Sequence, residues 1–61
     1  MWESIERLLK DQKITAYALA KKADVNYQML AELKSGKKKD LKFANVCKLA
    51  DALGVSTEEF R

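Results

Sequence analysis

The chain has 61 residues, of which 48% are hydrophobic and 34% charged, and its formal net charge is +3. We expect a single domain over residues 1–61, which buries only about 60% of the surface that it exposes when unfolded and leaves no room for a deep catalytic pocket. The chain has no proline and only two glycines, so helices joined by short loops are favoured over strands joined by tight turns.

Two amphipathic helices are predicted in the first part of the chain. Apolar residues recur every three to four positions over residues 2–12 and predict the first helix. Thr15 is placed to cap a short second helix that ends at about Ala23. Asp24 then breaks the chain, because aspartate tolerates the left-handed backbone conformation better than most residues do. The side chains that we expect to face inward from the second helix are Leu19, Ala20 and Ala23.

Two further helices are predicted on either side of a lysine-rich loop. Asn26 is placed to cap a third helix over about residues 27–35, and Gly36 is placed to end it. Residues 37–40 form the loop, and a fourth helix follows over about residues 42–53. Its predicted apolar stripe consists of Phe43, Val46, Cys47, Ala50 and Leu53.

A fifth short helix is predicted at the end of the chain. Ser56 and Glu59 have the spacing of a capping box, in which each side chain bonds the other residue's backbone amide. We expect Phe60 to pack back on the core and Trp2 to cover it from the other end of the chain. The alternative for these two aromatic residues is a dimer surface.

The positive charge is concentrated in the middle of the chain. Residues 21–48 contain eight lysines and three acidic residues, whereas the two ends together carry four basic and six acidic residues. A basic middle segment between acidic ends predicts that one face of the protein is directed at a polyanion.

Other classes of protein are poorly supported. Cys47 is the single cysteine, which is typical of a reducing cytoplasm, and we interpret it as a small core residue. With no histidine and no second cysteine, we expect no zinc site, no cofactor and no enzymatic activity. No apolar run approaches the roughly 18 residues of a membrane span, and no signal peptide follows Met1, which we take as the natural start.

The second and third helices together predict a helix-turn-helix. A turn of about three residues forces them to cross closely, with Ala20 as the small residue at the contact and Val25 as the apolar residue in the turn. Burial of one side of the third helix leaves its opposite side in solvent. An exposed helix held in this way has the shape that enters a DNA major groove, about 12 Å wide. The residues on its exposed side are Tyr27, Gln28, Ala31 and Glu32.

These segments resemble the lambda-repressor-like domain, also called the Cro/CI-type or XRE family of helix-turn-helix domains. The resemblance covers about residues 3–60, and its most specific parts are L-A-K-K-A-D-V at 19–25 and L-A-D-A-L-G-V-S at 49–56. It implies an all-α, compact five-helix bundle with the helix-turn-helix formed by helices 2 and 3. It also implies a repressor-like bacterial or phage transcription regulator that binds double-stranded DNA at the nucleoid. Family members often bind two-fold operators as dimers, which leaves a homodimer open.

The resemblance also implies which residues contact DNA. The start of the third helix would read bases, through Asn26, Tyr27, Gln28 and Glu32. The start of the second helix, the end of the third and the loop beyond would hold phosphates, through Thr15, Tyr17, Lys34, Ser35, Lys37, Lys38 and Lys39. The chemistry agrees, because glutamine can bond adenine bidentately and lysines attract phosphates.

Plainer interpretations stay open beside these. Glu32 can pair with a nearby lysine instead of accepting from cytosine, Tyr27 can cover the end of the second helix, and the lysine run can be only a solvated loop. The chain also departs from the family at Ala16, where glutamine often braces a phosphate, and at Asp24, where glycine is common. The second hypothesis is therefore a protein-interaction module that has the fold without DNA binding.

Overall fold

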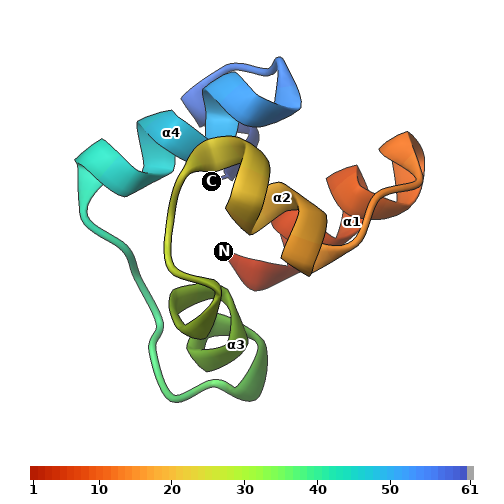
Figure 1. Cartoon of the computed structure of the whole chain (residues 1–61). Coiled ribbons are helices and arrows are strands. Elements are labelled where there is room, and N and C mark those ends of the chain that lie inside the picture. The colour runs from red at the N-terminus through yellow and green to blue at the C-terminus, as the bar shows by residue number, and fades with distance from the viewer. Residues whose placement is uncertain (61) are drawn as a thin grey trace.

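Helices make up the whole regular structure of residues 1–60, the part of the chain that the computed structural model describes (Figure 1). The elements are α1 (Trp2–Gln12), α2 (Ala16–Ala23), α3 (Tyr27–Ser35), α4 (Phe43–Leu53) and the 3-10 helix η1 (Thr57–Phe60). No strand occurs in this range. The all-α expectation is confirmed, and the bounds of the four α-helices agree with the predicted ones to within one residue.

The predicted fifth helix is wrong as an α-helix. Thr57–Phe60 is a four-residue 3-10 helix, in which the amide of Glu59 donates to the carbonyl of Ser56 at 3.1 Å. The Ser56 hydroxyl accepts from the amide of Glu58 at 3.2 Å and not from that of Glu59. So short a segment closes only one turn, and bonds between residues three apart tighten it into the 3-10 form. The bundle therefore has four α-helices and a closing 3-10 turn.

A side-chain cap begins each helix of the α2–α3 pair. Thr15 Oγ1 accepts a hydrogen bond from the amide of Ala18 at 3.1 Å, and Asn26 Oδ1 accepts one from the amide of Gln28 at 2.8 Å. Between the two helices Asp24 adopts the left-handed conformation, with φ 57° and ψ 47°. These are the predicted roles of the three polar residues, and two of them, Asp24 and Asn26, form the turn that leads from α2 into α3.

We expect Asp24→Gly to stabilise the protein. A side chain in the left-handed region is strained, and glycine removes that strain at the cost of a more flexible unfolded chain, for a net gain on the order of 0.5 kcal/mol. Thermal unfolding followed by circular dichroism should show a rise in Tm of about 2–4 °C. Lys13→Gly is the matched comparison, because Lys13 ends α1 with φ 56°. An unchanged or lower Tm for Asp24→Gly would contradict the expectation.

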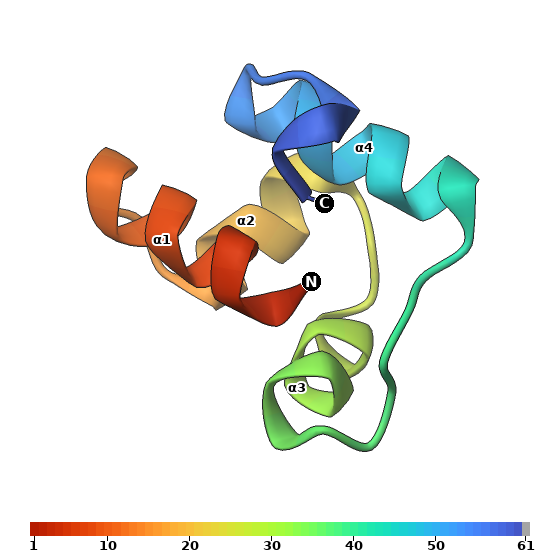
Figure 2. The ribbon, with the colours of Figure 1, turned by 180° about the vertical axis from the view of Figure 1, so that it is seen from behind.

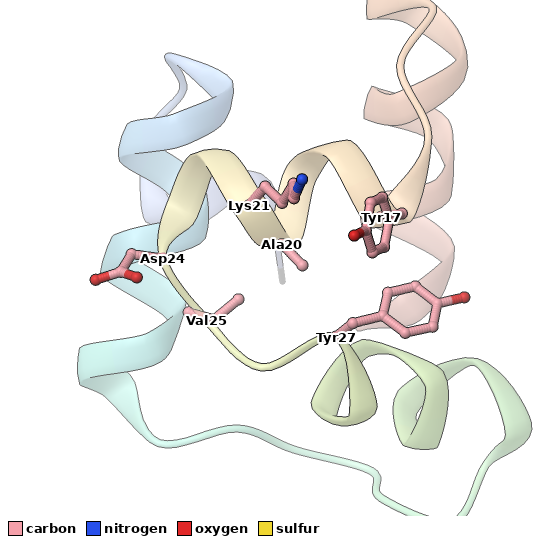
Figure 3. Close-up of a pocket in the computed structure, with 6 residues that line it drawn as sticks. All are labelled: Tyr17, Ala20, Lys21, Asp24, Val25 and Tyr27. Carbon is pink, nitrogen blue, oxygen red and sulfur yellow. The ribbon is translucent and has the colours of Figure 1, made fainter.

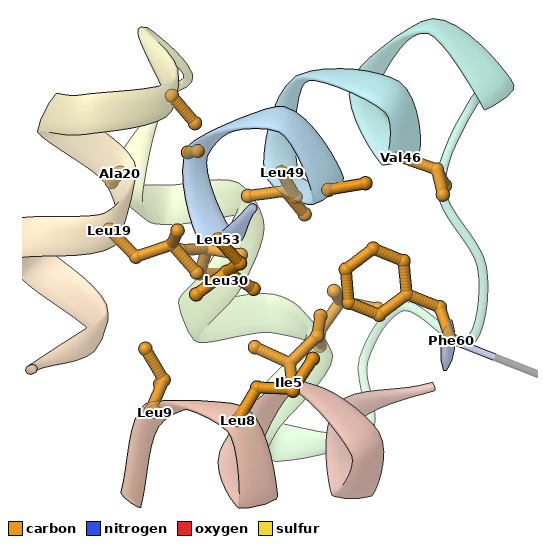
Figure 4. Close-up of a cluster of buried hydrophobic side chains, with 14 residues drawn as sticks. Ile5, Leu8, Leu9, Leu19, Ala20, Leu30, Val46, Leu49, Leu53 and Phe60 are labelled. Atoms are coloured by element: carbon orange, nitrogen blue, oxygen red, sulfur yellow. The ribbon is translucent and has the colours of Figure 1, made fainter. Parts of the chain in front are cut away.

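The core draws one fully buried side chain from each α-helix (Figure 4). These residues are Ile5, Leu19, Leu30 and Leu49, each with 0% exposure. Smaller or less central apolar residues surround them, and Phe60 of η1 closes the core while Trp2 packs against its edge. The predicted role of both aromatic residues as covers of the core is confirmed. No helix within residues 1–60 combines the length and the apolar character that crossing a membrane requires.

The predicted stripe of α4 is partly wrong. Phe43 is 70% exposed, and Cys47 is only half-buried. The buried face of α4 is centred instead on Leu49, which the predicted stripe omitted; with it lie Val46, Ala50, Ala52 and Leu53. Helical spacing also relates positions 46, 49, 50 and 53. A buried face built on these positions encloses Leu49 in place of Cys47, and the larger leucine removes more apolar surface from water. Phe43 begins the helix, at the end remote from Leu53.

Candidate nucleic-acid interface

Helix α3 has one buried side and one exposed side. Leu30 and Leu33 are 0% and 5% exposed and attach the helix to the core. On the other side Gln28 is exposed and Tyr27 is 45% exposed, whereas Ala31 and Glu32 are half-buried. The predicted orientation is confirmed for the first turn of α3, and the second turn lies closer to the rest of the protein.

Helix α3 stands at one end of the molecule. Figures 1 and 2 show it apart from the layer formed by α1, α2 and α4, joined to that layer by the α2–α3 turn and by the long loop that leads to α4. Of the α-helices, α2 makes the main contact with α3. The exposed side of α3 is therefore free of other helices and is flanked by the start of α2 and by the lysine loop.

An open pocket of about 430 Å³ lies in the elbow between α2 and α3 (Figure 3). The rings of Tyr17 and Tyr27 meet edge to face across it, with centroids 5.9 Å apart and planes at 65°. The Nζ atom of Lys21 lies 5.2 Å from the centroid of the Tyr17 ring. Tyr27 thus packs on α2, as its plainer interpretation predicted, but it covers the start of that helix and not its end, and almost half of Tyr27 stays exposed. Ala20, Asp24 and Val25 complete the lining.

A match to a family of known domains identifies the fold of which α2 and α3 are part. The family model for the Cro/C1-type HTH DNA-binding domain matches residues 4–60. The chain belongs to the Cro/C1-type helix-turn-helix family. Comparisons with curated proteins and with solved structures found no match. The resemblance expected from residues 19–25 and 49–56 is confirmed, and α2 and α3 are the helix-turn-helix of this Cro/C1-type domain.

The end of α3 is ordered by its own hydrogen bonds. The Ser35 hydroxyl donates to the carbonyl of Glu32 at 3.1 Å and accepts from the amide of Lys37 at 3.4 Å. The amide of Lys38 also donates to the carbonyl of Glu32, at 3.1 Å, and Gly36 ends the helix with φ 86°. In the Cro/C1-type domain these bonds draw the first half of the lysine loop back against α3.

Glu32 forms an ion pair with this loop. Its Oε1 atom lies 3.8 Å from the Nζ atom of Lys38, and the two side chains are 23% and 51% exposed respectively. The geometry agrees with the plainer interpretation, in which Glu32 pairs with a lysine. Within residues 1–60 the other ion pair joins Arg7 to Glu59, so no acidic partner lies within ion-pair distance of Lys34, Lys37 or Lys39.

The predicted contact residues fall into two groups in the structure. The base-reading group lies at the N-cap and on the first two turns of α3. In this group the side-chain oxygen of Asn26 already accepts the capping hydrogen bond from the amide of Gln28. The phosphate group is split between the start of α2 and the end of α3 with its loop. All are exposed except Glu32, which is half-buried; in chain order they are Thr15, Tyr17, Asn26, Tyr27, Gln28, Glu32, Lys34, Ser35, Lys37, Lys38 and Lys39.

Sequence reasoning missed Lys21. It follows Tyr17 by four residues, a spacing that brings two side chains together on one side of a helix, and a cation over a tyrosine ring is a known attraction. That spacing was a usable signal in the sequence. No group of three or more potential metal ligands of the His, Cys, Asp or Glu type occurs among residues 1–60.

Proposed function

We propose that this Cro/C1-type domain binds double-stranded DNA sequence-specifically, with α3 in the major groove, as a repressor-like transcription regulator of the bacterial or phage kind. Residues 1–61 act as a single domain in this proposal, and the DNA is that of the nucleoid. The observation that carries it is the exposed first turn of α3, on the same helix and loop as Lys34, Lys37 and Lys39, which form no ion pair within residues 1–60. A helix of this kind fits a groove about 12 Å wide.

The exposed first turn of α3 supplies the base-reading groups. Gln28 is exposed and can bond N6 and N7 of adenine bidentately, and the ring of Tyr27 offers apolar surface to a thymine methyl group. The loop lysines attract phosphates whatever the sequence, so they supply affinity and register. Base reading and phosphate binding thus have separate residues in this proposal.

Selection of bound duplexes from a random DNA pool tests this function. We expect an enriched consensus, and a palindromic one would indicate two copies on a two-fold site. Gln28→Ala should then reduce discrimination at one base pair by roughly 5- to 150-fold and leave the others unchanged. A protein that selects no consensus and shifts no duplex at low salt would contradict the proposal.

Capture of a protein partner is the second candidate function. Three large hydrophobic side chains are exposed, and Phe43 is the most exposed of them at 70%. A partner that binds equally well to the wild type and to Gln28→Ala, together with no shift of duplex DNA, would favour this function over the first.

We expect Glu32→Gln to tighten binding to duplex DNA. The change removes a negative charge beside the phosphates and releases Lys38 from its 3.8 Å ion pair. Affinity should rise by about two- to fivefold, and the plot of log affinity against log salt should steepen by up to about 0.9. Fluorescence anisotropy at several salt concentrations measures both. A selective loss of binding to sites with cytosine at one position would instead assign Glu32 to base reading.

A further inference from the structure

Three side chains form a continuous stack on the outer surface of the helix-turn-helix. Lys21 lies over the ring of Tyr17, and the ring of Tyr17 meets that of Tyr27 edge to face. Figure 3 shows the Tyr17 ring projecting from α2 toward Tyr27, whose own ring points away from Val25 and carries its hydroxyl at the far end. The stack therefore joins the α2 surface to the first residue of the helix that faces DNA.

The contacts of Tyr27 restrict where its ring can go. Tyr27 is the first residue of α3 and is 45% exposed, so core packing does not enclose its side chain. The edge-to-face contact at 5.9 Å favours one ring orientation, because the positive edge of one ring meets the negative face of the other. The ammonium group of Lys21 at 5.2 Å holds the Tyr17 ring in turn.

We propose that Tyr17 is a positioning residue for sequence recognition, which acts by holding the ring of Tyr27 in the orientation that meets a base pair. The inference rests on the proposed function, since it assigns a role within DNA binding. It differs from a role for Tyr17 as a phosphate contact, in which the hydroxyl and not the ring would matter. Lys21 supports the same arrangement from α2.

The two roles of Tyr17 predict different effects on binding. Loss of a phosphate contact weakens binding to all sequences alike, because phosphates carry no sequence information. Loss of a positioning contact changes the preference at the base pair that Tyr27 meets and leaves other positions unaltered. The relevant readout is therefore the ratio of affinities for two duplexes that differ at a single base pair.

The test compares Tyr17→Ala, Tyr17→Phe, Tyr27→Ala and the double alanine variant on the consensus duplex and on its single-base variants. We expect Tyr27→Ala to abolish a preference of roughly fivefold or more at one base pair. Tyr17→Ala should lower the same preference by at least half, whereas Tyr17→Phe should retain it. The double alanine variant should show the same preferences as Tyr27→Ala alone. Tyr17 is 58% exposed and alanine favours helices, so circular dichroism should show a folded protein.

Lys21→Ala tests the contribution of Lys21, and Lys22→Ala is its matched control. Both remove one positive charge from α2, and only Lys21 lies over the Tyr17 ring. We expect a reduced preference at the Tyr27 base pair for Lys21→Ala alone. A uniform loss of affinity for Tyr17→Phe and Tyr17→Ala, with every preference intact, would overturn the inference and leave the proposed function standing. Failure of the wild type to select any consensus would remove both.

Discussion

Replacing Leu30 with alanine is expected to remove about half of the protein's free energy of unfolding. Leu30 has no exposed surface and holds α3 to the core from the side opposite Gln28. Truncating a buried leucine to alanine costs about 2–5 kcal/mol, and a domain of this size has roughly 3–9 kcal/mol of stability in total. Thermal unfolding followed by circular dichroism should show a broad transition at a much lower temperature, or none.

Gln28→Ala is the matched control for this variant, because it changes the exposed side of the same helix. Its Tm should stay within a few degrees of the wild type. The pair separates the two sides of α3, since one variant loses stability and the other keeps its stability and loses base discrimination. A Leu30→Ala protein that melts as the wild type does would mean that α3 is not held by this contact.

The second large effect is expected from neutralising the lysine loop. Changing Lys37, Lys38 and Lys39 to glutamine should lower affinity for duplex DNA on the order of a hundredfold at low salt. The slope of log affinity against log salt should become shallower by about 1.8 to 2.7, since each phosphate contact contributes about 0.9 and Lys38 is already paired with Glu32. Preferences among sequences should persist, because these side chains act on phosphates. Anisotropy titrations across a range of salt concentrations measure both quantities.

The control for the loop variant carries the same change in charge elsewhere. Glutamine at Lys10, Lys13 and Lys48 also removes three of the chain's positive charges, and Figures 1 and 2 place the end of α1 far from the loop. We expect a small, nonspecific loss of affinity and a nearly unchanged slope. Equal effects of the two triple variants would show that net charge, and not the position of the loop, governs binding.

The features predicted correctly are those that depend on neighbouring residues. The caps at Thr15 and Asn26 bond amides two or three positions away, and Asp24 adopts an unusual backbone conformation that its own side chain tolerates. Helical spacing identified Leu30 and Leu33 as the buried side of α3, which fixed the opposite side as exposed. Such features follow from local chemistry and so could be deduced without a structure.

The features predicted wrongly depend on tertiary packing or on very short segments. Phe43 matches a helical stripe by its spacing, yet it is the first residue of α4 and its side chain is 70% exposed at the edge of the core. Cys47 and Leu49 lie on different faces of α4, and packing against the other helices decides which face is buried. Capping-box spacing at Ser56 cannot distinguish one turn of 3-10 helix from a short α-helix.

The candidate site likewise contains features that follow from local sequence and features that depend on tertiary packing. Exposure of Gln28 and of the loop lysines follows from the pattern of buried residues. The contact between Tyr17 and Tyr27 depends on how two helices cross, and the ion pair between Glu32 and Lys38 depends on how the loop turns back after Gly36. Sequence reasoning listed most of these residues singly, and their pairing required the three-dimensional arrangement.

The shared core has a consequence for motion. Because each α-helix contributes one fully enclosed side chain to a single cluster, no helix can detach without exposing apolar surface on the other three. The amides in the second half of α3 should therefore exchange with deuterium only when the entire domain opens, while the amide of Lys39 exchanges at once. The backbone of α3 is thus held as firmly as the core, and in the proposed function DNA would meet a helix that is already ordered.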